Sequence, residues 1–257
     1  MTTIELFPVD PHNKRTIQQG HPPGWTNRGG GEYDLVVLGG GPAGVVAAMT
    51  AAAGGHHVAM TEQRLTGGTC VNFGCTPSKA LIRCARAVHE AGRGANFGFR
   101  LDGLPRSDFG AVMERVRRIR SLSSAGDAVQ VVEQTGAEVY LGHTHFTAPN
   151  VVEVDGRQLR FRKAIIATGS DPLVPPIDGL RTGEYLTNES VFSLTELPAT
   201  LMSLLRATWH SRKNSPMRRW RPRGSASPMR SMKPIAEPES LSFPIAPTPT
   251  LKWRRSV

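Results

Sequence analysis

Two cysteines separated by four residues could carry out redox chemistry in this chain. Cys70 and Cys75 enclose the segment Val-Asn-Phe-Gly, and Gly74 favours a tight turn across which two sulfur atoms can meet. Thr76 is a good N-cap and Pro77 suits the first position of a helix, so we expect Cys75 just before a helix N-terminus. A thiolate is stabilised in that environment. The spacing therefore indicates a redox-active cysteine pair.

Two other interpretations of this pair remain open. A zinc half-site would need two further ligands at suitable spacing, and the sequence has no second cysteine pair. The two cysteines could also be structural and inert. Cys84 follows nine residues after Cys75 on the same expected helix, and we expect it to be a small core residue. The pairs His56-His57 and His143-x-His145 have no cysteine or carboxylate companion, so we predict no metal site.

A glycine-rich turn forms the second motif, Gly39-x-Gly41-x-x-Gly44. It follows an apolar run and opens a stretch of small residues, which is the strand-to-helix context that a dinucleotide site requires. The glycines permit close approach of a diphosphate, and the free N–H groups at the helix start favour its negative charge. Glu62 ends the next expected strand, about 20 residues further on, where an acid accepts ribose hydroxyls. We predict a dinucleotide site, with a ligand-free glycine loop as the alternative.

The hydrophobic pattern predicts the elements that position these motifs. Strands are expected at 34–38, 57–61 and 163–168, and helices at 42–53, 77–91 and 108–135. The last helix carries Arg115, Arg117, Arg118 and Arg120, which we expect to form a solvated face. Short antiparallel strands are expected at 139–141, 151–154 and 159–161, with Asp155-Gly156 as a hairpin turn. Residues 1–31 are expected to form an irregular arm. The pattern indicates an α/β fold: a Rossmann-like parallel sheet with helices on both faces and an appended antiparallel β-meander.

Three segments resemble a known family. The run from Gly67 to Lys79, GGTCVNFGCTPSK, strongly resembles the active-site segment of class I pyridine nucleotide–disulfide oxidoreductases, which include dihydrolipoamide dehydrogenase, glutathione reductase and mercuric reductase. Residues 167–170 followed by 175–177 resemble the second fingerprint of that family, and residues 187–198 resemble its linker into the NAD(P) domain. The arm around His21-Pro22-Pro23-Gly24-Trp25 is most similar to the mercuric reductase-like branch. The resemblance covers roughly residues 1–200, with 32–198 as the FAD-binding domain.

The resemblance implies a role for each motif residue. Cys70 would be the interchange thiol that meets the substrate, and Cys75 the charge-transfer thiol beside the flavin. Thr69 and Lys79 would lie near the flavin, and the backbone of Thr144 would reach the adenine. The ADP half of FAD would be held by Gly39, Gly41, Pro42, Ala43, Gly44 and Glu62, and the dinucleotide would pass close to Ala167, Thr168 and Gly169.

The family also implies a reaction and partners. In the complete enzyme NAD(P)H reduces FAD, FAD reduces the disulfide, and the resulting dithiol reduces a disulfide, thiol or metal-ion substrate. Members of the family are homodimers. The substrate and the choice between NADH and NADPH do not follow from the cysteine segment.

The character of the chain changes at about residue 199. Residues 1–198 carry 19 basic and 19 acidic residues, whereas residues 199–257 carry 12 basic and 2 acidic residues together with eight prolines and nine serines. No second glycine fingerprint, later flavin segment or dimer domain follows Pro198. We therefore expect this tail to be disordered or translated in a wrong reading frame, and the enzyme to be truncated and of doubtful activity.

Three alternative functions remain open on the sequence alone. The basic tail could bind nucleic acid or an anionic membrane surface, although unpatterned Lys and Arg support only non-specific binding. The chain could be a non-catalytic flavin-binding fragment, or a thiol protein that works without flavin. Because residues 1–31 contain no apolar core segment and no uninterrupted apolar run of about 20 residues occurs, we expect a cytoplasmic protein.

Overall fold

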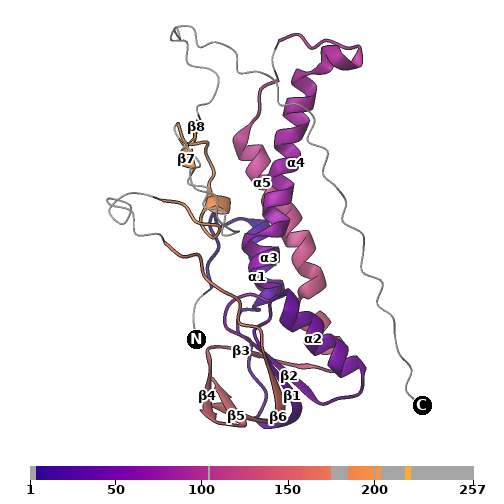
Figure 1. Cartoon of the computed structure of the whole chain (residues 1–257), viewed down its shortest axis with the longest axis vertical. Coiled ribbons are helices and arrows are strands. Elements are labelled where there is room, and N and C mark those ends of the chain that lie inside the picture. The colour runs from indigo at the N-terminus through magenta and orange to yellow at the C-terminus, as the bar shows by residue number, and fades with distance from the viewer. Residues whose placement is uncertain (1–3, 104, 175–184, 200, 204–217, 221–257) are drawn as a thin grey trace, which may run out of the picture. The chain divides into compact units, whose positions relative to one another are not determined.

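A six-stranded sheet lies at one end of the first of two compact units, which spans residues 1–198 (Figure 1). The computed structural model describes residues 4–103, 105–174, 185–199, 201–203 and 218–220. The strands are β1 (Gly31–Leu38), β2 (Val58–Glu62), β3 (Glu138–Leu141), β4 (Thr144–Ala148), β5 (Val151–Val154) and β6 (Arg157–Ile166). Their order is β3-β2-β1-β6-β5-β4.

The helices of this unit are α1 (Pro11–Gly20), α2 (Pro42–Ala53), α3 (Gly68–Phe73), α4 (Cys75–Gly92), α5 (Phe109–Ser123) and α6 (Val129–Gln134). Short 3-10 turns lie at Gly94–Phe97, Ser124–Asp127 and Val191–Ser193.

The strand pairing confirms the expected fold class. β1 pairs in parallel with β2 and β6, and β2 pairs in parallel with β3. The other three strands continue as an antiparallel meander in the order β4, β5, β6. The fold is therefore a Rossmann-like α/β domain with an antiparallel extension, as the sequence predicted.

The two faces of the sheet are buried in different ways. Alternating strand residues point to opposite faces, so Val37 and Met60 face one side while Val36 and Ala59 face the other. The first face packs against α2 and α6, whose contributions include Val45, Ala48, Val129 and Val132. The second cluster draws its described members from strands alone, including Val152, Val154 and Leu159 of the meander. The expectation of helices on both faces was wrong, because the meander covers the second face.

Three expected elements differ in the structure, two of them because distant segments pair with them. Residues 139–141 belong to β3, which pairs in parallel with β2 rather than in an antiparallel meander. The expected strands 159–161 and 163–168 are one strand, β6, which pairs with β1 along one edge and with β5 near its start. The single long helix expected at 108–135 is broken between α5 and α6, where Ala128 is extended.

The arm at residues 1–31 is not irregular throughout. Asp10 caps α1 by accepting a hydrogen bond from the N–H of Asn13 at 2.7 Å, and Pro11 occupies the first helical position. The helix packs against α5. Figure 1 shows α4 and α5 side by side, extending away from the sheet.

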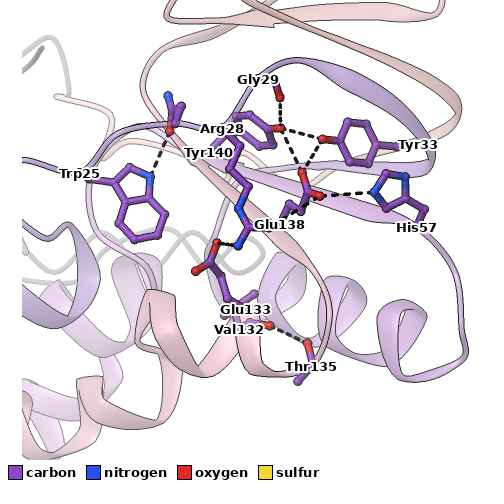
Figure 2. A network of polar contacts seen from close by, with 11 residues as sticks. Trp25, Arg28, Gly29, Tyr33, His57, Val132, Glu133, Thr135, Glu138 and Tyr140 are labelled. Atoms are coloured by element: carbon purple, nitrogen blue, oxygen red, sulfur yellow. Dashed lines mark hydrogen bonds and ion pairs between the residues drawn. The ribbon is translucent and has the colours of Figure 1, made fainter.

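A polar network ties together the starts of β1 and β3, at the opposite strand ends from the glycine turn (Figure 2). The Tyr33 hydroxyl donates to Glu138 Oε2 at 2.7 Å, and the Tyr140 hydroxyl donates to the carbonyl of Gly29 at 2.8 Å. Glu138 Oε1 also lies 3.4 Å from His57 Nε2. These bonds join segments more than 100 residues apart in the chain, so they fix the register at this end of the sheet.

The second compact unit, residues 199–257, has one described feature. β7 (Leu201–Ser203) and β8 (Arg218–Trp220) pair as antiparallel strands. The expected disorder of the tail otherwise falls outside the residues that the structure describes, as do residues 175–177 of the second fingerprint. Among the described residues, no helix is long and apolar enough to cross a membrane.

Candidate functional site

The glycine turn packs directly against the end of β6. Gly39 has a φ of +105°, and a Cβ atom placed there would lie 2.3 Å from the carbonyl oxygen of Ala167. The N–H of Ala167 donates to the carbonyl of Leu38 at 2.8 Å. The structure thus brings the first glycine of one predicted motif against the Ala167-Thr168-Gly169 segment of another, and only glycine fits at position 39.

The other two glycines have different surroundings. A Cβ atom on Gly44 would lie 1.7 Å from the carbonyl oxygen of Gly39, so helix α2 can contact the turn only because Gly44 has no side chain. Gly41, the N-cap of α2, is open instead. In the part of the chain that the structure describes, the only atom outside its own neighbourhood within 4 Å of a Cβ there is the Cα atom of Gly68, at 3.9 Å. This arrangement leaves space for a diphosphate beside the N–H groups of the first turn of α2, which fits a dinucleotide.

Glu62 lies at the end of β2 and faces the glycine turn. Its Oε2 accepts a hydrogen bond from the N–H of Gly40 at 2.7 Å, and its Oε1 accepts one from the N–H of Arg64 at 2.7 Å. Burial raises the pKa of Glu62, and these backbone hydrogen bonds oppose that rise. A carboxylate has about four acceptor positions, so two remain for ribose hydroxyls. The placement of Glu62 fits the predicted ribose contact.

The two cysteines lie on consecutive helices rather than across a simple turn. Cys70 is in α3 and Cys75 is the first residue of α4, with Gly74 between the helices at φ −139° and ψ −107°. Thr76 is therefore not an N-cap, because α4 begins one residue before it. Cys75 does lie at the expected helix N-terminus. Both cysteines are free thiols in this structure.

The thiol of Cys70 is influenced chiefly by its neighbour. Its pKa is raised, first by the side-chain interaction with Cys75 and second by partial burial, while the positive charge of Lys79 opposes the rise. Cys70 is half-buried and Cys75 is exposed. The structure therefore brings the two predicted redox residues and Lys79 into one electrostatic environment.

The cysteine segment and the glycine turn are in direct contact. A Cβ atom on Gly68, the first residue of α3, would lie 2.7 Å from the Cα atom of Gly41. The N–H of Gly67 donates to the carbonyl of Gly40 at 2.8 Å. The start of the helix that carries Cys70 thus abuts the turn that would hold a diphosphate.

Most of the remaining predicted site residues are exposed. Thr69 and Lys79 are exposed on α3 and α4. Thr144 opens β4 and is half-buried. Pro42 and Ala43 are exposed in the first turn of α2, and Thr168 and Gly169 are exposed after β6.

Cys84 and the histidine pairs lie outside this contact. Cys84 is half-buried and accepts a hydrogen bond from Arg115 Nη1 at 3.5 Å, so it is not the apolar core residue that we expected. The rings of His143 and His145 stack with centroids 6.3 Å apart. The described part of the chain contains no group of three or more side chains that could hold a metal ion.

Sequence reasoning missed two buried arginines beneath the cysteine helix. The arginines of α5 were expected to form a solvated face, but Arg117 is 7% exposed and Arg120 is 2% exposed. Helix α1 packs over them, and Asp10 forms an ion pair with Arg117. The cap signal Asp10-Pro11 could have revealed this helix, and with it a covering element for α5.

Comparisons with known proteins point to one family. A family model described as "Pyridine nucleotide-disulphide oxidoreductase" matches residues 33–204. Mercuric reductase from Staphylococcus aureus is 32% identical over 171 residues, covering 66% of this chain and 31% of that protein. Mercuric reductase from Streptomyces lividans is 36% identical, covering 67% and 37%. Dihydrolipoyl dehydrogenase from Acholeplasma laidlawii is 31% identical, covering 66% and 52%.

A solved structure gives the same result. The HOCl-induced flavoprotein disulfide reductase RclA from Escherichia coli superimposes with a TM-score of 0.52 at 29% identity, covering 65% of this chain and 35% of that one. The chain thus spans about a third of the length of the mercuric reductases and of this reductase. With the family model matching more than half of its residues, the chain belongs to the pyridine nucleotide-disulphide oxidoreductase family, whose members are FAD-dependent flavoproteins.

Proposed function

We propose that residues 32–198 bind FAD and carry the redox pair Cys70–Cys75 of an NAD(P)H-dependent disulfide-type oxidoreductase. The observation that carries this proposal is the contact between Gly41 and Gly68, which sets the cysteine helix against the dinucleotide turn. A cofactor whose diphosphate lay at that turn would extend along the start of α3. A disulfide two residues beyond Gly68 would then lie within reach of its redox-active end.

The first turn of α2 would bind the diphosphate. Backbone N–H groups at the N-terminus of this 12-residue helix supply hydrogen bonds and a favourable dipole. Glu62 would orient the ribose through its remaining acceptor positions. Ala167-Thr168-Gly169 would line the other side, because Ala167 already contacts Gly39.

The cysteines would exchange electrons with the substrate. FAD supplies an electron pair taken from NAD(P)H. With two protons, that pair converts the Cys70–Cys75 disulfide into two thiols. The Cys70 thiolate then attacks a substrate disulfide, releasing one substrate thiolate that takes up a proton. Cys75 next attacks the mixed disulfide, which releases the second substrate thiol and restores the Cys70–Cys75 bond.

The substrate class follows the family rather than the described geometry. The relatives are named for mercuric ion and dihydrolipoyl chemistry, and we propose a disulfide, thiol or metal-ion substrate here. We also propose the cytoplasmic location expected from the sequence, since a reducing compartment keeps such a pair in turnover.

Absorbance spectroscopy of the purified full-length chain tests the proposal. After incubation with FAD and removal of free cofactor, we expect a bound flavin band near about 450 nm and a long-wavelength charge-transfer shoulder on reduction with dithiothreitol. Cys70→Ser should keep the shoulder, because Cys75 is assigned to the flavin. Cys75→Ser should abolish it, and Cys84→Ser serves as the matched control. A folded chain that retains no flavin at saturating FAD would refute the proposal.

We also propose that residues 199–257 are translated in a wrong reading frame. The family match ends at residue 204, close to the point where the charge and composition change. Translating the alternative frames of the coding DNA tests this directly. A family-like continuation with a second glycine fingerprint is expected in one of those frames, and its absence from both would reject the idea.

A further inference from the structure

Arg120 of α5 is buried against the segment that separates the two cysteines. Its side chain is 2% exposed. Nη1 donates to the backbone carbonyl of Asn72 at 3.1 Å, and Nη2 donates to Oδ1 of Asn13 on α1. The guanidinium therefore links three helices, and one of its two arms holds a peptide oxygen between Cys70 and Cys75.

Asn72 extends this link to the other end of α3. Its side chain is fully buried, and Nδ2 donates to the carbonyls of Thr66 and Gly68, each at 3.0 Å. Arg120 thus contacts α3 near its C-terminal end, while the Asn72 side chain contacts its start. Helix α3 has only six residues, too few to be stable by itself, so its position depends on such contacts.

The buried charge of Arg120 is costly to maintain. Among the described residues no carboxylate lies within ion-pair distance of Arg120, since Asp10 pairs with Arg117 instead. Burial lowers the pKa of Arg120 to about 10, with the charge of Asp10 opposing and that of Arg117 adding to the shift. An apolar side chain of similar size would avoid this desolvation. Unlike an apolar side chain, the guanidinium of Arg120 donates a hydrogen bond to the carbonyl of Asn72.

We propose that Arg120 is a positioning residue for the redox pair. It holds the end of α3 so that the Cys70 sulfur stays within bonding distance of the Cys75 sulfur. This inference rests on the proposed function of the pair. Without the hydrogen bond, the short helix samples more positions, and the effective concentration of one thiol at the other falls.

The disulfide equilibrium constant measures this effect without flavin or substrate. The full chain, carrying Cys84→Ser, is equilibrated with reduced and oxidised glutathione and quenched by alkylation. Two cysteine thiols and one oxidised glutathione convert to one intramolecular disulfide and two reduced glutathiones. For Arg120→Met we expect about a tenfold lower constant for disulfide formation, which corresponds to about 30 mV in potential.

The neighbouring Arg117→Met is the matched control. It removes another buried cation from the same face of α5, but Arg117 binds Asp10 and makes no hydrogen bond to α3. Its stability should fall while its disulfide equilibrium constant stays within about twofold of the parent. Arg120→Lys should recover part of the loss, because an ammonium can still reach one carbonyl.

The outcomes separate the inference from the proposed function. A folded Arg120→Met with the parent constant overturns the positioning role and leaves the redox pair intact. If that variant does not fold, Asn13→Ala decides, because it removes the second acceptor of the guanidinium without altering α3. For Asn13→Ala we expect the equilibrium constant for disulfide formation to fall about threefold, and an unchanged constant overturns the inference. A parent chain that forms no Cys70–Cys75 disulfide at any glutathione ratio overturns the proposed function itself.

Discussion

Gly44 is the residue whose replacement should most directly disturb the cofactor turn. A Cβ atom there would lie 1.7 Å from the carbonyl oxygen of Gly39, so Gly44→Ala must displace α2 from the turn. We expect a loss of about 1–3 kcal/mol in the free energy of unfolding, measured by urea denaturation, and weaker FAD binding. Gly126→Ala is the control, because no atom of the described residues lies within 4 Å of its Cβ position, and it should be neutral or slightly stabilising. Equal stability of the two variants would contradict the packing argument.

The thiol of Cys70 should become more reactive when its neighbour is removed. The interaction with Cys75 is the largest cause of the raised pKa of Cys70, so Cys75→Ala should lower that pKa and increase the thiolate fraction at pH 8. We expect iodoacetamide to alkylate Cys70 several-fold faster in Cys75→Ala than in the parent, with Cys84→Ser in both backgrounds. The pH profile of the alkylation rate should move to lower pH. A profile that stays in place would show that Cys75 does not control the Cys70 thiol.

At the level of elements, the packing of α1 on α5 depends on one carboxylate. Asp10 caps α1 and also forms an ion pair with the buried Arg117. Asp10→Asn keeps the capping oxygen but leaves the buried guanidinium of Arg117 without its ion-pair partner. We expect it to destabilise the chain by about 3 kcal/mol in urea denaturation.

The corresponding cap on α5 provides a comparison for Asp10. Asp108 caps that helix by accepting from the N–H of Ala111 at 3.1 Å and is exposed. Asp108→Asn should therefore cost less than about 1 kcal/mol. Similar losses for the two substitutions would mean that capping, rather than the buried charge, holds α1 in place.

The polar network at the starts of β1 and β3 should make the folding stability depend on pH. Burial alone would raise the pKa of Glu138, but hydrogen bonds from Tyr33, His57 and Tyr140 lower it overall. A carboxylate with a lowered pKa stabilises the fold above its ordinary pKa, and that contribution is lost as the pH falls through the folded value.

The substitution Glu138→Gln tests whether stability falls with pH in this direction. The stability advantage of the parent over Glu138→Gln should be fully present at pH 7 and should shrink between pH 5 and pH 3, since an unperturbed glutamate titrates at about 4.3. Thermal unfolding followed by circular dichroism at each pH measures the difference. Parallel stability curves for the two proteins across this range would exclude a contribution from the Glu138 carboxylate.

For the molecule as a whole, the second half of β6 is an exposed sheet edge. Residues 159–166 pair with β1, whereas β5 covers only residues 157–160 in the described part of the chain. Ile165 and Ile166 are 38% and 68% exposed. An edge with exposed apolar residues favours association between chains, so we expect the isolated chain to have poor solubility.

Ile166→Lys should reduce this association. A charge at a strand edge disfavours pairing with another chain, so light scattering should show a several-fold smaller aggregated fraction than in the parent. Leu101→Lys is the matched control, because Leu101 is also exposed, at 47%, but lies outside any strand. If both substitutions improve solubility equally, total surface hydrophobicity rather than the β6 edge is responsible.

The sequence alone predicted those features that depend on neighbours in the chain. The glycine turn, the acid at the end of the next strand, and the order of strand and helix around them follow from short spacings and from periodicity. Cys75 at a helix start was likewise predictable, although the cap residue was wrong because α4 begins at the cysteine itself. The family membership that the cysteine segment predicted is confirmed by the match to residues 33–204.

Only the tertiary structure decided which distant segments meet. A strand carries no local sign of whether its partner runs parallel, so β3 was assigned to the wrong pairing. The sequence pattern predicted a solvated face for the arginines of α5, but helix α1 covers Arg117 and Arg120. The pattern could not show this, because the burial of these side chains depends on an element about 100 residues away in the chain. The sequence by itself thus determined the motifs and the local elements, whereas long-range packing decided that Arg120 lies behind the cysteine pair.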